Sequence, residues 1–249
     1  RGESIIPRDS KKPIFNKIKE LVLKKYFRYF DYIFYTCTGN MLYLKQYIKN
    51  TDNMRLFPCA VDNNYFSEIK SKYIQQRPIL RKKYSICEDD IVILFAARFT
   101  KRKRPYDLIK AVSKINDGRI VLMFCGDGPE KLTMEEAAEK LSARSIFTGL
   151  LSQEELGKHY LIADIYTILS DYDASPKTLN EAINFDLPII ASDMLGNAPD
   201  LVINDNNGFI VQAGDVKAIQ KKLEYLLDNI ETMKRKSMLT SGKLLKNWS

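Results

Sequence analysis

The chain has 249 residues, of which 45% are hydrophobic and 28% are charged, and its formal net charge is +8. This length allows one or two domains with a buried core, and the composition excludes disordered, collagen-like and disulfide-stapled proteins. The longest apolar runs, such as residues 91–97, are too short to span a bilayer. Because the chain begins at Arg1 without a Met or a signal-like segment, we expect a fragment of a longer protein.

Metal and thiol chemistry find little support in the sequence. The four cysteines form no CxxC pair, and His159 is the only histidine. A zinc site would therefore lack ligands at usable spacing, and we expect free thiols in a reducing compartment. His159 itself is expected to be a surface or packing residue.

Both ends of the chain are basic. Residues 1–57 hold 12 Lys/Arg against 5 Asp/Glu, and residues 229–249 hold 5 against 1. Two basic ends around a slightly acidic middle argue against a nucleic-acid channel. Residues 11–30 alternate cations with apolar residues at near-helical spacing, which is compatible with docking on anionic lipid. The alternative, a solvated helix face over a core stripe, is favoured because amphipathic helices more often cover a protein core.

The first 57 residues are too few for a domain and are expected to be the last βα units of a preceding one. A linker, residues 58–66, and a polar Lys-rich segment, residues 67–83, follow without an assigned element. The patterns predict helices at residues 12–30 and 40–48, and strands at 32–37 and 54–57.

From residue 91 onward, apolar β-rich runs alternate with segments of helical period. Strands are predicted at residues 91–96, 120–125, 145–148, 165–169, 188–192 and 209–211. Helices are predicted at residues 105–115, 130–142, 153–163, 176–185, 198–204 and 215–228. This alternation predicts a Rossmann-like α/β domain, a parallel sheet with helices on both faces that binds ligands at its carboxyl edge.

Three parts are therefore expected. Residues 1–66 are the end of an N-terminal acceptor-side domain plus linker, and residues 67–228 are the Rossmann-like domain. Residues 229–249 are expected to form a basic helix that frays near Gly242, which leaves Trp248 in a tail without a signal.

Five cations follow the strand at residues 91–96, in a loop that ends where a helix begins. Arg offers a planar fork of donors and Lys a compact charge, a combination that suits a diphosphate. An exposed basic turn is the alternative that this loop allows by itself. The cations are Arg98, Lys101, Arg102, Lys103 and Arg104.

The next strand ends in a glycine-rich loop. Gly126 and Gly128 allow a sharp turn close to a ligand, and Pro129 suits a first helical turn. A dinucleotide fingerprint would follow the first strand and place Gly or Ala where Lys131 stands, so NAD binding is disfavoured. A plain strand-to-helix turn is the alternative.

The most specific stretch is residues 173–182. Ser175 suits an N-cap and Pro176 a first helical residue, so free N–H groups would point into the crevice and suit a phosphate. Asp173 precedes this helix and Glu181 lies about 8 Å along it, within reach of a sugar and a ribose respectively. The alternative is a capped helix with a surface Glu. Asp171 and Asp173 also spell an Asp-x-Asp, which we interpret as coincidental rather than as a metal site.

In this order, the motifs resemble those of group-1 retaining nucleotide-sugar glycosyltransferases of the GT-B fold, over most of the chain. Arg98 and Lys103 match an Arg-x4-Lys pair, and residues 126–129 match a Gly-x-Gly-Pro loop. Asp173 and Glu181 match a pair of Glu residues, although the first is here one methylene shorter. Asp186 stands where the family has a Gly before a Pro. Further matches are residues 147–149, 207–209 and 61–66.

The resemblance implies a role for each matched position. Arg98 and Lys103 would hold the diphosphate, and Asp173 would contact the transferred sugar, as the three catalytic residues. Glu181 would bind the ribose. Catalysis would be mainly electrostatic, and no metal or other cofactor is expected. The remaining donor-binding residues would be Gly126, Gly128, Phe147, Thr148, Ser175, Pro176, Lys177, Thr178 and Leu179.

The function expected from this resemblance is transfer of a sugar from a UDP- or GDP-linked donor to a glycan or lipid-linked acceptor. The setting would be bacterial cell-surface polysaccharide synthesis, such as capsule or lipopolysaccharide, in the cytoplasm and peripherally on the inner membrane face. The acceptor site would lie mostly in the missing N-terminal part, so the chain is expected to bind donor without a complete acceptor site. A non-catalytic nucleotide-sugar-binding module is the alternative, and a dehydrogenase is disfavoured by the glycine spacing.

Overall fold

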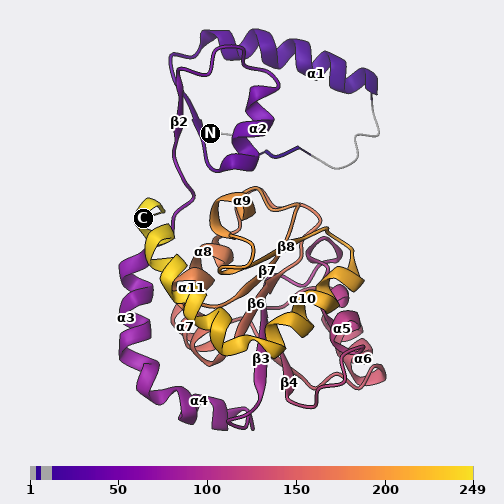
Figure 1. Cartoon of the computed structure of the whole chain (residues 1–249). Helices are drawn as coiled ribbons and strands as arrows, with labels where there is room; N and C mark the ends of the chain where they lie inside the picture. Colours follow the sequence, from indigo (N-terminus) through magenta and orange to yellow (C-terminus); the bar gives the residue numbers. More distant parts are fainter. Residues whose placement is uncertain (1–3, 7–12, 249) are drawn as a thin grey trace.

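The computed structural model describes residues 4–6 and 13–248. The chain forms a small N-terminal part and a larger α/β part, which one extended segment connects (Figure 1). No helix within the described ranges is both long and apolar enough to cross a membrane.

The larger part is built on a six-stranded parallel sheet in the order β5-β4-β3-β6-β7-β8. Each strand lies within one residue of its predicted bounds, because fully buried parallel strands are short continuous apolar runs. The strands are β3 (Ile91–Ala96), β4 (Ile120–Cys125), β5 (Ser145–Gly149), β6 (Ile165–Ile168), β7 (Ile189–Ser192) and β8 (Gly208–Val211). The predicted Rossmann-like sheet is confirmed.

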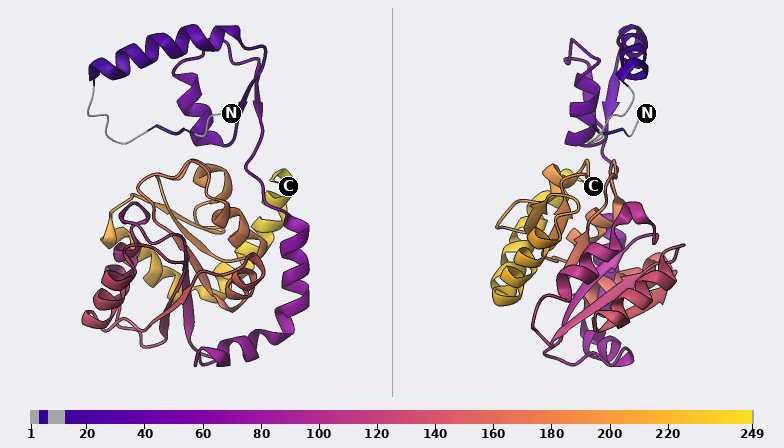
Figure 2. Two further views of the ribbon diagram at one scale, coloured as in Figure 1. Left: turned by 180° about the vertical axis from the view of Figure 1, so that it is seen from behind. Right: turned by 90° about the vertical axis from the view of Figure 1, so that its right-hand side faces the viewer.

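Helices cover both faces of this sheet (Figure 2). Val92 and Leu94 face one core with α7, α8 and α9, whereas Ile93 and Phe95 face the other with α5, α6 and α10. This alternation follows from the two-residue period of a strand. The helices are α5 (Pro105–Val112), α6 (Lys131–Lys140), α7 (Gln153–Ile162), α8 (Lys177–Asn184), α9 (Ala198–Leu201) and α10 (Val216–Asp228).

The strand order reverses between β3 and its neighbour β6. The chain leaves β3 toward β4 on one side and leaves β6 toward β7 on the other. In open α/β sheets the crevice outside the carboxyl ends of strands at such a point is the usual ligand site. The loops after β3 and β6 are therefore the expected position of a ligand-binding site.

The N-terminal part contains α1 (Pro13–Tyr26), β1 (Ile33–Tyr35), α2 (Thr38–Lys45) and β2 (Met54–Leu56). β1 and β2 pair in parallel over a small core that includes Ile33 and Leu44. The prediction that the apolar stripe of the first helix covers a core is wrong for its described side chains. Ile18 is 58% exposed, Leu21 71% and Val22 59%.

Two helices, α3 (Asn63–Tyr73) and α4 (Arg77–Lys83), lie in a segment for which the sequence predicts no helix or strand. Asp62 caps α3 by accepting a hydrogen bond from the Tyr65 amide at 3.0 Å. Only Phe66 and Ile69 of α3 are fully buried, against α7 and α8, so its hydrophobic pattern is too sparse to predict a helix.

The C-terminal segment does not fray at Gly242. α11 (Ile230–Leu244) continues through a 3₁₀ turn, and Trp248 is buried at the end of the chain. The Trp248 carbonyl accepts a hydrogen bond from Asn63 Nδ2 at 3.2 Å, which fixes the end of the chain to α3.

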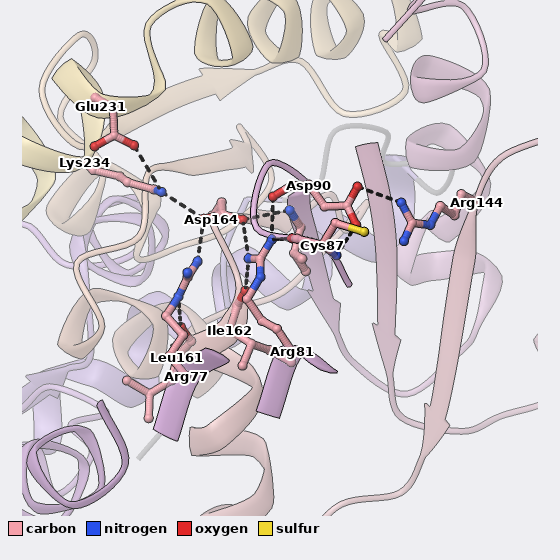
Figure 3. Close-up of polar contacts among 11 residues, drawn as sticks. Arg77, Arg81, Cys87, Asp90, Arg144, Leu161, Ile162, Asp164, Glu231 and Lys234 are labelled. Carbon is pink, nitrogen blue, oxygen red and sulfur yellow. Dashed lines mark hydrogen bonds and ion pairs between the residues drawn. The ribbon is translucent and has the colours of Figure 1, made fainter. Parts of the chain in front are cut away.

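A buried ionic cluster lies at the amino edge of the sheet, opposite the ligand edge (Figure 3). Asp164, directly before β6, accepts hydrogen bonds from Arg77, Arg81 and Lys234 at 2.8–3.1 Å. Burial by itself raises the pKa of Asp164, but Lys234, the Val92 amide and Arg77 outweigh it and hold that pKa below its ordinary value. The cluster therefore ties α4 and α11 to the sheet.

Candidate functional site

The loop after β3 presents its cations at the carboxyl edge. Arg98 is exposed, whereas the neighbouring Phe99 is buried and anchors the loop. A short 3₁₀ helix, η3 (Lys101–Lys103), then leads to Arg104, whose φ of 53° is unusual for a residue other than glycine. This turn directs the side chain of Lys103 toward the loop after β6.

The loop after β6 meets these cations with carboxylates. Lys103 Nζ donates to Asp173 Oδ2, and both side chains are more than four-fifths buried. Arg104 Nη1 donates to Asp171 Oδ1 at 2.7 Å, and the Asp171 amide donates to the Arg102 carbonyl at 2.8 Å. The two loops are thus joined at the point where the strand order reverses, and Lys103 and Asp173 lie together there.

Helix α8 starts one residue later than predicted. Pro176, not Ser175, is the N-cap, with extended backbone angles, and α8 begins at Lys177. Proline has no side-chain acceptor, so the first-turn amides keep their hydrogen-bonding capacity. Leu179 N–H donates to the Pro176 carbonyl at 3.3 Å, which leaves the amides of Lys177 and Thr178 as the donors at this end.

Two side chains beside this helix start have unused hydrogen-bonding atoms. Ser175 Oγ and Asn197 Oδ1 are buried and have no partner among the residues that the structure describes. Asn197 Nδ2 donates to the Pro176 carbonyl at 3.2 Å, which fixes the turn before α8. Buried polar atoms without a hydrogen-bond partner are uncommon in folded proteins.

Glu181 is buried in the interior of the larger part rather than exposed on its surface. It is 8% exposed, and its Oε2 accepts a hydrogen bond from the Tyr160 hydroxyl at 3.0 Å. Burial raises the pKa of Glu181, while the bond from Tyr160 and the charge of Lys177 oppose that rise. The alternative of a surface Glu is therefore wrong.

Gly126 and Gly128 serve the packing of the loop after β4. Their φ values are 140° and 157°, and a Cβ atom would lie 2.0 Å from the Ala97 carbonyl oxygen or 2.3 Å from that of Phe99. The two glycines therefore allow this loop to lie against the backbone of the cation-bearing loop. A side chain at either position would push that loop out of place.

Phe147 and Thr148, at the end of β5, use their side chains internally. The ring of Phe147 stacks on Phe124 with centroids 4.9 Å apart. Thr148 Oγ1 donates to the Gly149 carbonyl at 3.1 Å.

The contact between the N-terminal part and these loops is not predicted from the sequence. The start of α2 and its N-cap Cys37 lie on the loops after β6 and β7: Cys37 Sγ donates to the Ala174 carbonyl at 3.2 Å, and Gly39 N–H donates to the Gly196 carbonyl at 2.9 Å. Asp200 of α9 accepts bonds from both the amide and the hydroxyl of Thr38, at 2.8 and 2.5 Å. Nothing in local periodicity encodes such a contact.

The carboxylates of the Asp-x-Asp are each engaged by a cation, Asp171 by Arg104 and Asp173 by Lys103. Across residues 4–6 and 13–248, no group of three or more His, Cys, Asp or Glu side chains is arranged to hold a metal ion. The cations of the loop after β3 and the first-turn amides of α8 are groups that suit an anion.

Two curated proteins show what the chain is similar to in sequence. The chain is 26% identical over 153 residues to N-acetyl-alpha-D-glucosaminyl L-malate synthase of Bacillus anthracis, covering 61% of this chain and 40% of that protein. It is 26% identical over 159 residues to an alpha-1,4-N-acetyl-D-galactosaminyltransferase of Campylobacter jejuni that acts on a diNAcBac-PP-undecaprenol-linked glycan, covering 63% and 43%. The matched region thus spans about two fifths of these relatives.

Solved structures show the same fold. HepE of Anabaena in complex with UDP superposes with a TM-score of 0.79 at 16% identity, covering 98% of this chain and 67% of that one. The sucrose-phosphate synthase of Thermosynechococcus elongatus superposes with a TM-score of 0.72 at 20% identity, covering 94% and 60%. The expected GT-B fold is confirmed.

The sequence profile that matches this chain does so over residues 76–240, a range that includes the sheet and every loop of the site. The chain therefore belongs to the family of group 1 glycosyl transferases.

Proposed function

We propose that this chain is the donor-binding part of a retaining glycosyltransferase that moves a sugar from a UDP- or GDP-linked donor to a glycan or lipid-linked acceptor. The observation that carries the proposal is the pairing of Lys103 with Asp173 beside the start of α8, at the switch point of the sheet. A diphosphate and a sugar are the neighbouring groups that such a cation and carboxylate suit.

The diphosphate is held by charge and by amides. Lys103 keeps two N–H donors besides the one given to Asp173, and Arg98 supplies a guanidinium from the same loop. The amides of Lys177 and Thr178 add the positive end of the α8 dipole. As the bond to the sugar breaks, negative charge grows on the leaving diphosphate, and these preorganised groups stabilise it.

The sugar and ribose are held by the two acids. Asp173 accepts hydrogen bonds from hydroxyls of the transferred sugar, and its pairing with Lys103 fixes the orientation of its shorter side chain. Glu181 accepts bonds from the ribose hydroxyls. The acceptor attacks the face that the diphosphate leaves, so the sugar keeps its anomeric configuration. The backbone at the end of β5 flanks the base.

Two comparisons support this proposal: HepE is described in complex with UDP, a nucleotide of the proposed donor class, and the Campylobacter relative acts on an undecaprenol-linked glycan, an acceptor of the proposed class. The proposed setting is the synthesis of a bacterial cell-surface polysaccharide such as capsule or lipopolysaccharide, on the cytoplasmic face of the membrane.

Calorimetric titration with UDP, GDP and their glucose conjugates tests the donor site. We expect one nucleotide series to bind, and Arg98→Ala to weaken that binding by about ten- to hundredfold because a charge-assisted contact is lost. Arg235→Ala, which removes an exposed arginine of α11, is the control and is expected to bind as the wild type does. Binding to no nucleotide, or equal binding by Arg98→Ala, contradicts the proposal.

We also propose that α1 docks on an anionic membrane surface. Its exposed apolar residues Ile18, Leu21 and Val22 are accompanied by exposed Lys17 and Lys25. An apolar stripe beside cations is the combination that binds the interface of anionic bilayers.

Co-sedimentation with vesicles tests this membrane contact. We expect binding to phosphatidylglycerol-containing vesicles that falls with salt, and little binding to pure phosphatidylcholine. Leu21→Glu is expected to reduce binding about tenfold or more, because it removes apolar burial and adds repulsion. Leu132→Glu on α6 serves as the control, because Leu132 is 73% exposed and Leu21 is 71% exposed. Equal loss in both variants would refute docking through α1.

A further inference from the structure

Tyr160 of α7 is fully buried beside the candidate site, and its ring is held from two sides. It stacks on Phe185 with centroids 5.3 Å apart and an interplanar angle of 21°. Tyr166 of β6 packs edge-on against it at 5.8 Å. With 0% of its surface exposed, the ring has a single orientation, and so does its hydroxyl group.

That hydroxyl points at α8. It donates to Glu181 Oε2 at 3.0 Å and lies 3.3 Å from the Thr178 carbonyl oxygen, so one group contacts both the carboxylate and the first turn of the helix. Burial raises the pKa of Tyr160, so the phenol keeps its proton and remains a donor. The Tyr160 phenol is therefore the uncharged partner of this hydrogen bond, and its fully buried ring fixes the position of the hydroxyl oxygen.

A buried glutamate needs such a contact if it is to present a defined oxygen. The side chain of Glu has three rotatable bonds, and an unpaired carboxylate in this position would turn or take up a proton because burial raises its pKa. The bond from Tyr160 occupies Oε2 and leaves Oε1 as the oxygen for a ligand.

We propose that Tyr160 is a positioning residue that orients Glu181 toward the ribose hydroxyls of the nucleotide donor. This inference rests on the proposed function, since it assumes that Glu181 meets the ribose. It acts through Glu181 and does not itself touch the nucleotide. Tyr160 should therefore matter for ligands that carry the ribose hydroxyls and not for those that lack them.

The test compares UDP with 2′,3′-dideoxy-UDP, and GDP with 2′,3′-dideoxy-GDP, by calorimetry. In the wild type we expect the ribose nucleotide to bind about tenfold or more tightly than its dideoxy analogue. Tyr160→Phe keeps the ring and removes the hydroxyl. It is expected to reduce the ratio of ribose-nucleotide affinity to dideoxy-nucleotide affinity about three- to tenfold, and to leave the affinity for the dideoxy nucleotide unchanged. Glu181→Gln is expected to narrow it at least as much. In the double variant the two effects should not add, because they report one contact.

The control is Tyr84→Phe, which removes another tyrosine hydroxyl that contacts α7, at His159 Nε2 and 2.9 Å. It is expected to keep the wild-type ratio. If Tyr160→Phe does not fold, as judged by thermal unfolding, Tyr160→Met also lacks the hydroxyl and fills the buried space with a flexible apolar side chain.

The outcomes separate the two proposals. The role of Tyr160 is refuted if Tyr160→Phe keeps the wild-type ratio of ribose-nucleotide to dideoxy-nucleotide affinity while Glu181→Gln reduces it. The proposed donor site is not affected by that result. Equal weakening of both nucleotides by Tyr160→Phe assigns the residue to structure alone and also refutes the inference. A wild-type ratio in Glu181→Gln, or binding of no nucleotide by the wild type, overturns the ribose site and with it the inference.

Discussion

Lys103→Ala is expected to lower the rate of sugar transfer by about 100- to 1000-fold, the range found when one donor to a developing negative charge is removed. Two effects combine. The ammonium that meets the leaving diphosphate is lost, and Asp173 loses its partner, which leaves an uncompensated carboxylate next to the phosphates. The rate is measured as release of nucleoside diphosphate from the donor with water as the acceptor, because the chain is expected to lack a complete acceptor site.

Lys101→Ala provides a matched control, because Lys101 lies in the same 3₁₀ turn with an exposed side chain. It is expected to keep nearly the wild-type rate. The double variant Lys103→Ala/Asp173→Asn should bind the donor more tightly than Lys103→Ala, since the repelling charge is removed. If Lys103→Ala is as active as Lys101→Ala, the assignment of Lys103 to the diphosphate is wrong.

Asp164→Ala is expected to lower the free energy of unfolding by about 3–5 kcal/mol, which is a large part of the stability of an ordinary domain. The Asp164 side chain is 5% exposed and pairs with Arg81, whose side chain is 4% exposed, so the variant leaves a buried guanidinium without its carboxylate. It also removes the acceptor of the Val92 amide at the start of β3. Urea denaturation measures the change.

Asp117→Ala is the control, because its partner Arg119 is half exposed and such a pair contributes less than about 1 kcal/mol. The direction of pH dependence gives a second check. Because the pKa of Asp164 is lowered in the folded state, its stabilisation is present above about pH 4, the value in the unfolded chain, and is lost as the pH falls further. A change below 1 kcal/mol in Asp164→Ala would show that Arg81 does not depend on this carboxylate.

The strands could be predicted from the sequence because the physics that forms them is local. A run such as Ile91–Ala96 is apolar at every position, and only a strand buried on both faces requires that. α3 could not be predicted in the same way, since two fully buried residues on a polar helix leave hardly any hydrophobic period to detect.

His159 was expected to be a surface or packing residue, and it is buried against Tyr84.

Some contacts among the candidate site residues could be predicted from the sequence, and others could not. Lys103 and Asp173 each follow a predicted strand, so their common edge follows from parallel topology. The partner of Glu181 lies 21 residues earlier on another helix, and no pattern in the sequence encodes that pairing. Ser175 was expected to cap α8 because its hydroxyl suits the position, but the chain turns one residue later and the proline takes it.

The first turn of α2 is linked to Asp173 through two successive backbone hydrogen bonds. Gly39 N–H donates to the Gly196 carbonyl, and Gly196 N–H donates to the Asp173 carbonyl, each at 2.9 Å. If the N-terminal part swings away, the first bond breaks and the second survives, because it lies wholly within the larger part. The backbone around Asp173 therefore keeps its hydrogen bond to Gly196 whether or not the N-terminal part stays in contact.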